Sequence, residues 1–278
     1  MTVLLVDIGN SRIKWRLADI ASAADPQRII WQGPEQVFTY EDHDDPGVHW
    51  HPIASRAVDT VLISNVSHTA RAAHVAEALA AVWPDAAIRQ VWPTASQSGV
   101  VNGYRVPEQL GADRWLAAIG AHRLYPTRTL LICNFGTATT IDLLLAASPG
   151  AAGALFVGGS ILPGLETMRM SLSSGTARLP LAHGAVVDFA DRTEDAIASG
   201  IMAAQLGAVE RSLRAARIRA ASALNAYPLL CVTTGGAAPA VSDSIAEIGV
   251  PTAHVPGLVL HGLATVASGT GATTQHPA

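Results

Sequence analysis

The sequence predicts an α/β protein with two domains. Short runs of β-branched and aliphatic residues lie around clear helical segments along most of the chain, which is typical of an α/β fold. The 278 residues are enough for one large domain or two ordinary ones, and 49% hydrophobic residues are ample for buried cores. We predict domains at residues 1–124 and 125–278.

In the first half, apolar runs predict strands and amphipathic segments predict helices. The first helix covers residues 68–83 and is stopped by Pro84, and the second covers residues 113–125 and ends before Pro126. A new strand begins soon after Pro126, which places the domain boundary near residue 125. The strands predicted in this half are residues 3–9, 28–33, 60–67 and 88–92.

The second half shows the same mixture of elements. A long helix is predicted at residues 195–217, and the final stretch from residue 268 has no periodicity and reads as a loose tail. The predicted strands are residues 129–136, 139–146, 153–159 and 229–236, the last of which runs into a glycine turn.

The two halves begin alike. LLVDIGNSRIKW and LICNFGTATTID each contain an apolar strand, an Asp or Asn, one further residue, a glycine, a polar pair and another strand. This similarity suggests two related halves that each open with a strand, a tight turn and a strand, and that face one another across a cleft.

The charge balance and the cysteines narrow the class of protein. The formal charge is −4, and the basic cluster at Arg211, Arg214, Arg217 and Arg219 is explained better by a solvated helix face than by a nucleic-acid stripe. Cys133 and Cys231 show no framework or metal-ligand spacing, so we expect buried thiols in a reducing cytoplasm. No apolar run reaches the roughly 18 residues that span a bilayer. We therefore expect no nucleic-acid partner and no membrane partner.

The segment DIGNSRIK has the residues of a phosphate-binding turn. Lys14 is the only lysine in the chain, and it follows Ile13 rather than a glycine, which excludes a Walker loop. Gly9 would let a ligand approach the backbone, Asp7 could hold a hydrated magnesium ion, and Lys14 would add a compact charge near phosphates. A plain β-hairpin, in which Asp7 satisfies the turn, is the alternative.

Two further segments carry polar groups that could bind a ligand or take part in catalysis. NFGTATTID offers a second such turn with a hydroxyl at Thr137, although an ordinary Thr-rich strand pair would look similar. In YRVPEQLGADRW, Asp113 could accept a proton from a substrate hydroxyl, and Arg114 could hold an anionic group. The alternative for Asp113 is a helix N-cap, which is a common position for Asp.

The ordered set DIGNSRIK, YRVPEQLGADRW, GTATTID, GGSILPG, TARLP, RTEDAIASGI and TTGG resembles the type III pantothenate kinase family over nearly the whole chain. The resemblance implies two ribonuclease-H-like domains of the sugar-kinase, actin and heat-shock-chaperone superfamily, with ATP in a central cleft. It also implies phosphorylation of pantothenate with Asp113 as the general base. The ATP-binding residues that it implies are Asp7, Ile8, Gly9, Asn10, Ser11, Arg12, Ile13, Lys14 and Thr137. The pantothenate-binding residues that it implies are Tyr104, Gly111, Ala112, Asp113, Arg114 and Thr193.

The resemblance also implies cofactors and a partner. Members of the family use magnesium and a monovalent cation, potassium or ammonium, and form homodimers whose substrate site borrows residues across the interface. The family's Asp associated with the monovalent cation is replaced here by Asn134, which lacks the negative charge and puts the requirement in doubt. Two alternatives stay open: a regulatory accessory factor on the same fold, and a kinase of another hydroxylated acid or a sugar.

Overall fold

The computed structural model describes residues 1–20, 28–39, 49–181, 183–222 and 228–269. Its described part divides into two compact units: unit 1 is Met1–Pro126 together with the segment that starts at Gly257, and unit 2 is Thr127–Pro256. The predicted second domain contained residues 257–269, whereas in the structure these residues group with unit 1.

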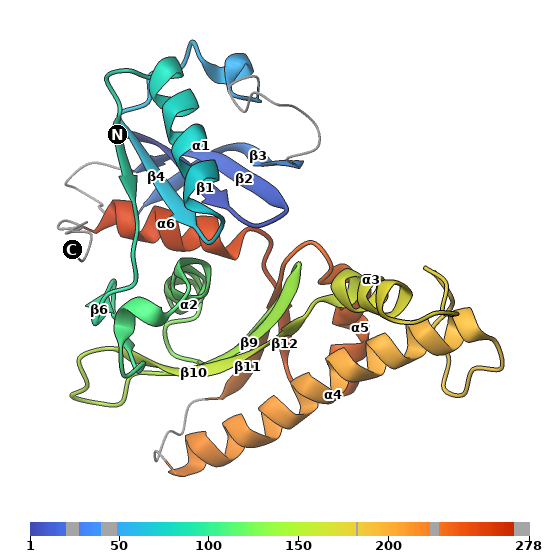
Figure 1. The fold of residues 1–278 in the computed structure, drawn as a ribbon. Coiled ribbons are helices and arrows are strands. Elements are labelled where there is room, and N and C mark those ends of the chain that lie inside the picture. Colours follow the sequence, from blue (N-terminus) through green and yellow to red (C-terminus); the bar gives the residue numbers. More distant parts are fainter. Residues whose placement is uncertain (21–27, 40–48, 182, 223–227, 270–278) are drawn as a thin grey trace. The chain divides into compact units, whose positions relative to one another are not determined.

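Unit 1 contains a five-stranded sheet in the order β3-β2-β1-β4-β5 (Figure 1). Neighbouring strands among β1, β2 and β3 pair antiparallel, and β1, β4 and β5 pair parallel. One face packs against α1, and α2 and α6 contact each other and the strands of the sheet. The bounds of these elements are β1 Thr2–Ile8, β2 Arg12–Ile20, β3 Ile29–Thr39, β4 Thr60–Asn65, β5 Ala87–Gln90, α1 Thr69–Val82, α2 Ala112–Leu124 and α6 Leu258–Ser268. Unit 1 also holds the short elements η2 His51–Ile53, β6 Ser96–Gln97, β7 Val100–Asn102 and η3 Pro107–Gln109.

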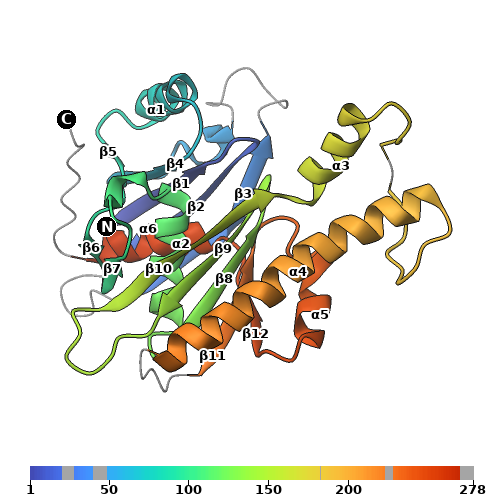
Figure 2. The ribbon, with the colours of Figure 1, turned by 60° about the horizontal axis from the view of Figure 1, so that its bottom comes forward.

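Unit 2 repeats this strand order. Strands β12, β11, β8, β9 and β10 lie side by side in that order, with β8, β9 and β10 antiparallel and β8, β11 and β12 parallel. Helices α4 and α5 cover one face of this sheet, as Figure 2 shows. The bounds are β8 Thr129–Phe135, β9 Ala138–Leu145, β10 Ala154–Pro163, α3 Leu165–Gly175, α4 Thr193–Ser222, β11 Leu229–Thr234, α5 Pro239–Glu247 and β12 Thr252–His254.

The shared topology explains the similar beginnings of the two halves. In each unit the first strand pairs antiparallel with the second and parallel with the fourth, and a tight turn follows the first strand. This is the strand arrangement of a ribonuclease-H-like domain, present twice. The predicted fold class of two such α/β domains is therefore confirmed.

Helix α6 was not predicted. Its residues are mostly apolar and buried, and its polar side chains His261, Thr265 and Ser268 recur at the spacing of one helix face, a signal that the sequence reasoning missed. It packs closely on α2: a Cβ on Gly120 would lie 2.5 Å from the carbonyl oxygen of Leu258, and one on Gly262 would lie 2.0 Å from that of Leu116. The predicted tail lies outside the described residues from 270 onward, and Ser268 still belongs to α6.

Other predictions from composition have clear outcomes. Cys133 and Cys231 are both free and buried, as expected, with 3.8 Å between their sulfur atoms. The four arginines of the basic cluster are exposed on α4. Within the described ranges, none of the helices combines the length and the apolar character needed to cross a bilayer.

Candidate active site

The first turn lies between β1 and β2 and is closed by a hydrogen bond from the Gly9 N–H to the Arg12 carbonyl oxygen, 3.0 Å long. Asn10, Ser11 and Arg12 are exposed at its tip. The side chains of Ile8 and Ile13 are instead fully buried in the core, so these two residues can offer a ligand only backbone groups.

Asp7 ends β1 directly opposite Lys14 on β2 and beside Ser64 on β4. Its Oδ1 atom is buried and has no hydrogen-bond partner among the described residues. Strands β1 and β2 do form the β-hairpin of the alternative interpretation, but the Oδ1 atom of Asp7 makes no hydrogen bond to its turn. The pKa of Asp7 is raised to about 7, mainly by burial and then by the negative charges of Asp113 and Glu35, while the positive charge of Lys14 and the Ser64 hydroxyl act against the rise.

The register of β1 and β2 therefore places the cationic side chain of Lys14 directly opposite Asp7. Its Nζ atom also lies 4.0 Å from Oε1 of Glu35 on β3, and both side chains are about one-quarter exposed. Sequence reasoning missed Glu35, because a glutamate within the strand segment PEQVFT carries no motif.

Asp113 occupies the second position of α2, and Gly111 is the N-cap residue. The N-cap interpretation of Asp113 is therefore wrong. Its Oδ1 atom accepts a hydrogen bond of 2.8 Å from the Arg114 N–H, and a Cβ on Gly111 would lie 2.8 Å from that same oxygen. Burial raises the pKa of Asp113, while the Arg114 N–H and guanidinium act against the rise.

Arg114 and Tyr104 meet in the structure, as the resemblance implied for two residues of one site. The Arg114 guanidinium is 6% exposed, and its Nη1 donates a 2.8 Å hydrogen bond to the Tyr104 hydroxyl oxygen. The same guanidinium lies 5.7 Å from the centre of the Tyr104 ring. Unit 1 therefore contains two partly buried carboxyl groups, a lysine, and a buried arginine that is hydrogen-bonded to a half-buried tyrosine.

The second turn, between β8 and β9, is held by neighbouring backbone. The Gly136 N–H donates to the Ala138 carbonyl oxygen, and the Thr137 carbonyl oxygen accepts from the Gly164 N–H at 3.0 Å and the Thr167 hydroxyl at 2.6 Å. Thr137 itself is exposed. Gly164, from the GGSILPG motif, thus packs on the turn itself.

Asn134 ends β8 against the TTGG motif. Gly235 has a φ of +94°, and a Cβ there would lie 2.5 Å from the Asn134 Oδ1 atom. Glycine is therefore required at position 235 for the close approach as well as for the backbone conformation. Thr140 and Thr234 are the register partners of Asn134 on the two flanking strands.

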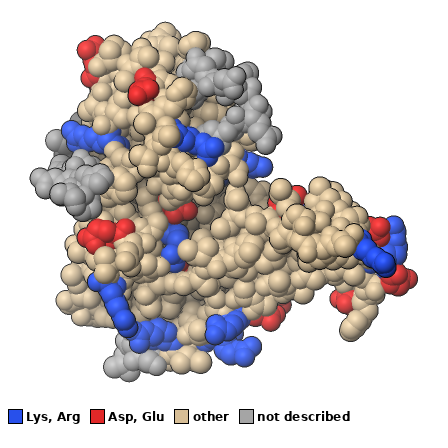
Figure 3. Space-filling model, in the orientation of Figure 1, with Lys and Arg blue, Asp and Glu red and all other residues tan. Residues whose placement is uncertain are grey.

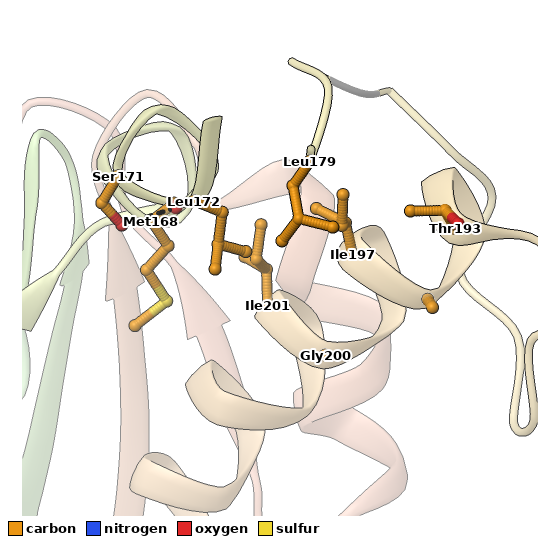
Figure 4. Close-up of a pocket in the computed structure, with 9 residues that line it drawn as sticks. Met168, Ser171, Leu172, Leu179, Thr193, Ile197, Gly200 and Ile201 are labelled. Carbon is orange, nitrogen blue, oxygen red and sulfur yellow. Dashed lines mark hydrogen bonds between the residues drawn. The ribbon is translucent and has the colours of Figure 1, made fainter. Parts of the chain in front are cut away.

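Thr193, the remaining predicted substrate residue, begins α4 in unit 2, whereas the other proposed pantothenate residues belong to unit 1. It lines a cavity of about 500 Å³ between α3 and α4. Figure 4 shows apolar side chains from both helices and their connection pointing toward one another in this cavity. They include Leu172, Leu179, Ile197 and Ile201.

The duplicated ribonuclease-H-like topology, with a polar turn after the first strand of each unit, places the chain in the sugar-kinase, actin and heat-shock-chaperone superfamily. Residues 3–215 match the family described as type III pantothenate kinase. The chain is 39% identical to the type III pantothenate kinase of Cupriavidus pinatubonensis, with 96% of this chain and 98% of that protein covered. It is 40% identical to that of Cupriavidus taiwanensis, with 95% and 97% covered. The chain belongs to the type III pantothenate kinase family.

A solved structure shows the same fold. A conserved protein of the Baf transcriptional activator family from Campylobacter jejuni matches with a TM-score of 0.51 and 17% identity, and the match covers 95% of this chain and 96% of that one. At this identity the likeness concerns the fold alone.

Proposed function

We propose that this chain transfers the γ-phosphoryl group of ATP to the primary alcohol of pantothenate, giving 4′-phosphopantothenate in the first step of coenzyme A biosynthesis. Membership of the family supports the reaction. The observation that carries the assignment of residues is the partly buried Asp113 carboxyl group, whose pKa is raised by burial, beside the Arg114–Tyr104 pair at the start of α2.

Asp113 is the proposed general base. Because burial raises the pKa of its carboxyl group, the carboxylate is more basic than an exposed one and accepts the hydroxyl proton more readily. The alcohol oxygen then forms a bond to the γ-phosphorus as the bond to ADP breaks. Arg114 is the proposed anchor for the single carboxylate of pantothenate, with Tyr104 holding its guanidinium in place. The resemblance to the family makes Thr193 a further proposed pantothenate-binding residue.

The residues from Asp7 to Lys14, together with Thr137, are the proposed contacts for ATP. The exposed tip of the first turn offers side-chain and backbone donors, and Lys14 offers a point charge. Asp7 fits a magnesium ligand, because its Oδ1 atom is buried without a hydrogen-bond partner within the described part of the chain. No group of three His, Cys, Asp or Glu side chains gathers there, so ATP oxygens and water would complete the magnesium shell. Magnesium bound with ATP would neutralise charge that builds up on the phosphates.

Asn134 is the proposed residue at a monovalent-cation site. Its Oδ1 atom and the neighbouring Thr140 and Thr234 offer oxygen ligands, which suit potassium or ammonium, but Asn134 contributes no charge. Asp142, two residues beyond Thr140 on β9, faces the same side of the sheet and is 2% exposed. We therefore expect a weaker site than one with a carboxylate at position 134, and compensation by Asp142 is the alternative.

A homodimer is the proposed assembly, and the α3–α4 arm (residues 165–206) is its proposed interface. Phe189 exposes 97% of its surface, and Leu181, Val186 and Val187 are exposed on the same arm. An aromatic side chain buries roughly 150–250 Å², about a quarter of the roughly 800 Å² that each partner contributes to a stable interface. The arm carries both an exposed aromatic side chain and an apolar cavity of about 500 Å³, so a two-fold arrangement of two copies could fill both at once.

The proposed location is the cytoplasm, where the reducing environment would keep the two buried cysteines free.

A coupled ADP-release assay with purified protein tests the reaction. We expect ATP-dependent release with pantothenate and much less with pantetheine or a panel of sugars. Release that does not depend on pantothenate would refute the proposed substrate, and release driven by a sugar would favour the alternative acceptor.

A further inference from the structure

Glu35 is brought to the site by an irregularity in β3. Trp15 pairs with Gln36, but Leu17 pairs with Gln32, so one residue of β2 faces three residues of β3. Gly33 adopts a φ of +84° within this bulge, and Pro34 has no N–H to lose from the ladder. Val37 is the register partner of Lys14, and Glu35 lies two residues from Val37, so Glu35 and Lys14 share one face of the sheet.

Both oxygens of Glu35 have close neighbours. Oε1 lies 4.0 Å from the Lys14 Nζ atom. A Cβ atom added to Gly257, the N-cap residue of α6, would lie 2.1 Å from Oε2 of Glu35. Gly257 has a φ of +61°. The absence of a side chain at Gly257 therefore leaves the space that the carboxylate occupies. A negative charge at the N-terminus of a helix is also favourable.

The other cation on this face is held elsewhere. The Arg16 Nε–H donates a 2.7 Å hydrogen bond to the Gly33 carbonyl oxygen, and the guanidinium lies 4.3 Å from the centre of the Trp31 ring. Glu35 also acts on Arg16, because its charge opposes the lowering of the Arg16 pKa by burial, but the ion pair that Glu35 forms at 4.0 Å is with Lys14. Lys14 stands between two carboxyl groups, Asp7 across the strand pair and Glu35 on β3.

We propose that Glu35 is a positioning residue that holds the Lys14 ammonium group away from Asp7, where it can meet the phosphates of ATP. The proposal rests on the proposed ATP-binding role of Lys14. Without Glu35, the ammonium group has one anionic neighbour left and pairs with Asp7. That pairing would withdraw Lys14 from the phosphates and would occupy the carboxyl group at the same time.

The positioning role and a simple charge effect predict opposite changes in ATP affinity when Glu35 is replaced. A carboxylate that acted only through its charge would repel the triphosphate, so its removal would tighten ATP binding. A positioning carboxylate gives the opposite result, because its removal weakens ATP binding. An exposed or half-exposed ion pair is worth up to about 1 kcal/mol, which corresponds to about a five-fold change in Kd.

The experiment is calorimetric titration of the full-length protein with magnesium-ATP, without pantothenate. We expect Glu35→Gln to raise the Kd for ATP about five-fold, and Glu35→Asp to raise it too, since aspartate keeps the charge but is one methylene shorter. The matched control, Glu77→Gln, removes the same charge from an exposed position on α1 and should leave the Kd unchanged. Thermal unfolding of each variant identifies any loss of fold.

A double-mutant cycle shows whether Glu35 acts through Lys14. In a Lys14→Met background, Glu35→Gln should have no further effect on the Kd. Tighter ATP binding by Glu35→Gln, unchanged binding by Glu35→Asp, or full additivity in the cycle would overturn the positioning role while leaving the proposed kinase function intact. Wild-type protein that does not bind ATP would overturn both.

Discussion

Replacing Asp7 with asparagine should stabilise the ligand-free fold at pH 8, although it removes a proposed ATP-site residue. In the folded protein the pKa of Asp7 is raised from 3.8 to about 7, mainly by burial. Below pH 3.8 the carboxyl group is protonated in both the folded and the unfolded chain. As the pH rises toward 7, the unfolded chain loses this proton first, so the wild-type fold loses stability over this interval.

The size of the effect follows from the pKa. At about 1.4 kcal/mol per pH unit, a rise from 3.8 to about 7 corresponds to about 4 kcal/mol, an upper limit because Asp7 interacts with Asp113. Asparagine is neutral at every pH. The difference in unfolding free energy between Asp7→Asn and the wild type should therefore grow from near zero at pH 4 to a few kcal/mol at pH 7 and above.

Urea unfolding of both proteins at several pH values between 4 and 8, without nucleotide or magnesium, measures this difference. Asp85→Asn, at an exposed position, is the matched control and should show no such trend. A constant difference across the pH range would show that Asp7 is not a buried, protonated group. A variant less stable than the wild type at pH 8 would show that a hydrogen bond to the carboxylate outweighs its burial.

Three further substitutions test the proposed site and interface. Asp113→Asn should lower kcat by roughly two to four orders of magnitude with the fold retained, as expected for a lost general base; normal turnover would contradict that role. Arg114→Ala should raise the KM for pantothenate by roughly 10- to 100-fold, the effect of losing a charge-assisted hydrogen bond; a change confined to the KM for ATP would contradict the anchor, and Arg114→Lys serves if the alanine variant unfolds. Phe189→Ser should shift sedimentation from dimer toward monomer; an unchanged dimer would place the interface elsewhere, and a wild-type monomer with full activity would refute the dimer.

The strands that position the site could be predicted, because each is a short apolar run interrupted by a polar turn. The apolar segments before Asp7 and Asn134 are first strands of the two units, as expected. The grouping of Arg114 with Tyr104 followed from the resemblance to the family and is present in the structure. Helix α6 was missed, because its residues are mostly apolar and only His261, Thr265 and Ser268 mark a polar face.

Two features of the site depend on tertiary contacts that leave no local pattern. Glu35 reaches Lys14 only because β3 bulges against β2, and the bulge is visible in the sequence as nothing more than a Gly-Pro pair. The alternative interpretation placed the N-cap of α2 at Asp113, two residues too late, because the actual N-cap residue Gly111 has no side chain to signal that position. Figure 3 shows mostly uncharged side chains along the middle of the α3–α4 arm on the face in view. The arm also carries two ion pairs, Arg169 with Glu166 and Arg192 with Glu194. That Leu181, Val186, Val187 and Phe189 are exposed could not be recognised before α3 and α4 were placed.

The last prediction concerns Asn134, where this chain departs from the family. A carboxylate at 4 Å attracts a monovalent cation by about 4 kcal/mol at an effective dielectric constant of about 20, before desolvation is subtracted. Recovering even one-third of that energy corresponds to about a ten-fold change in affinity. Asn134→Asp should therefore lower the half-activating potassium concentration about ten-fold when activity is titrated in a buffer free of sodium and ammonium.

Asp142 is the residue that could make this prediction fail, because it already places a buried carboxyl group on the same face of the sheet. If Asp142 supplies the charge, Asp142→Asn should raise the half-activating potassium concentration while Asn134→Asp changes little. If neither substitution moves that concentration, the cation does not bind beside Asn134, and the role implied by the resemblance does not apply at this position. Thermal unfolding in potassium and in choline, measured for both variants, separates a lost cation from a damaged fold, since a bound cation stabilises only the folded chain.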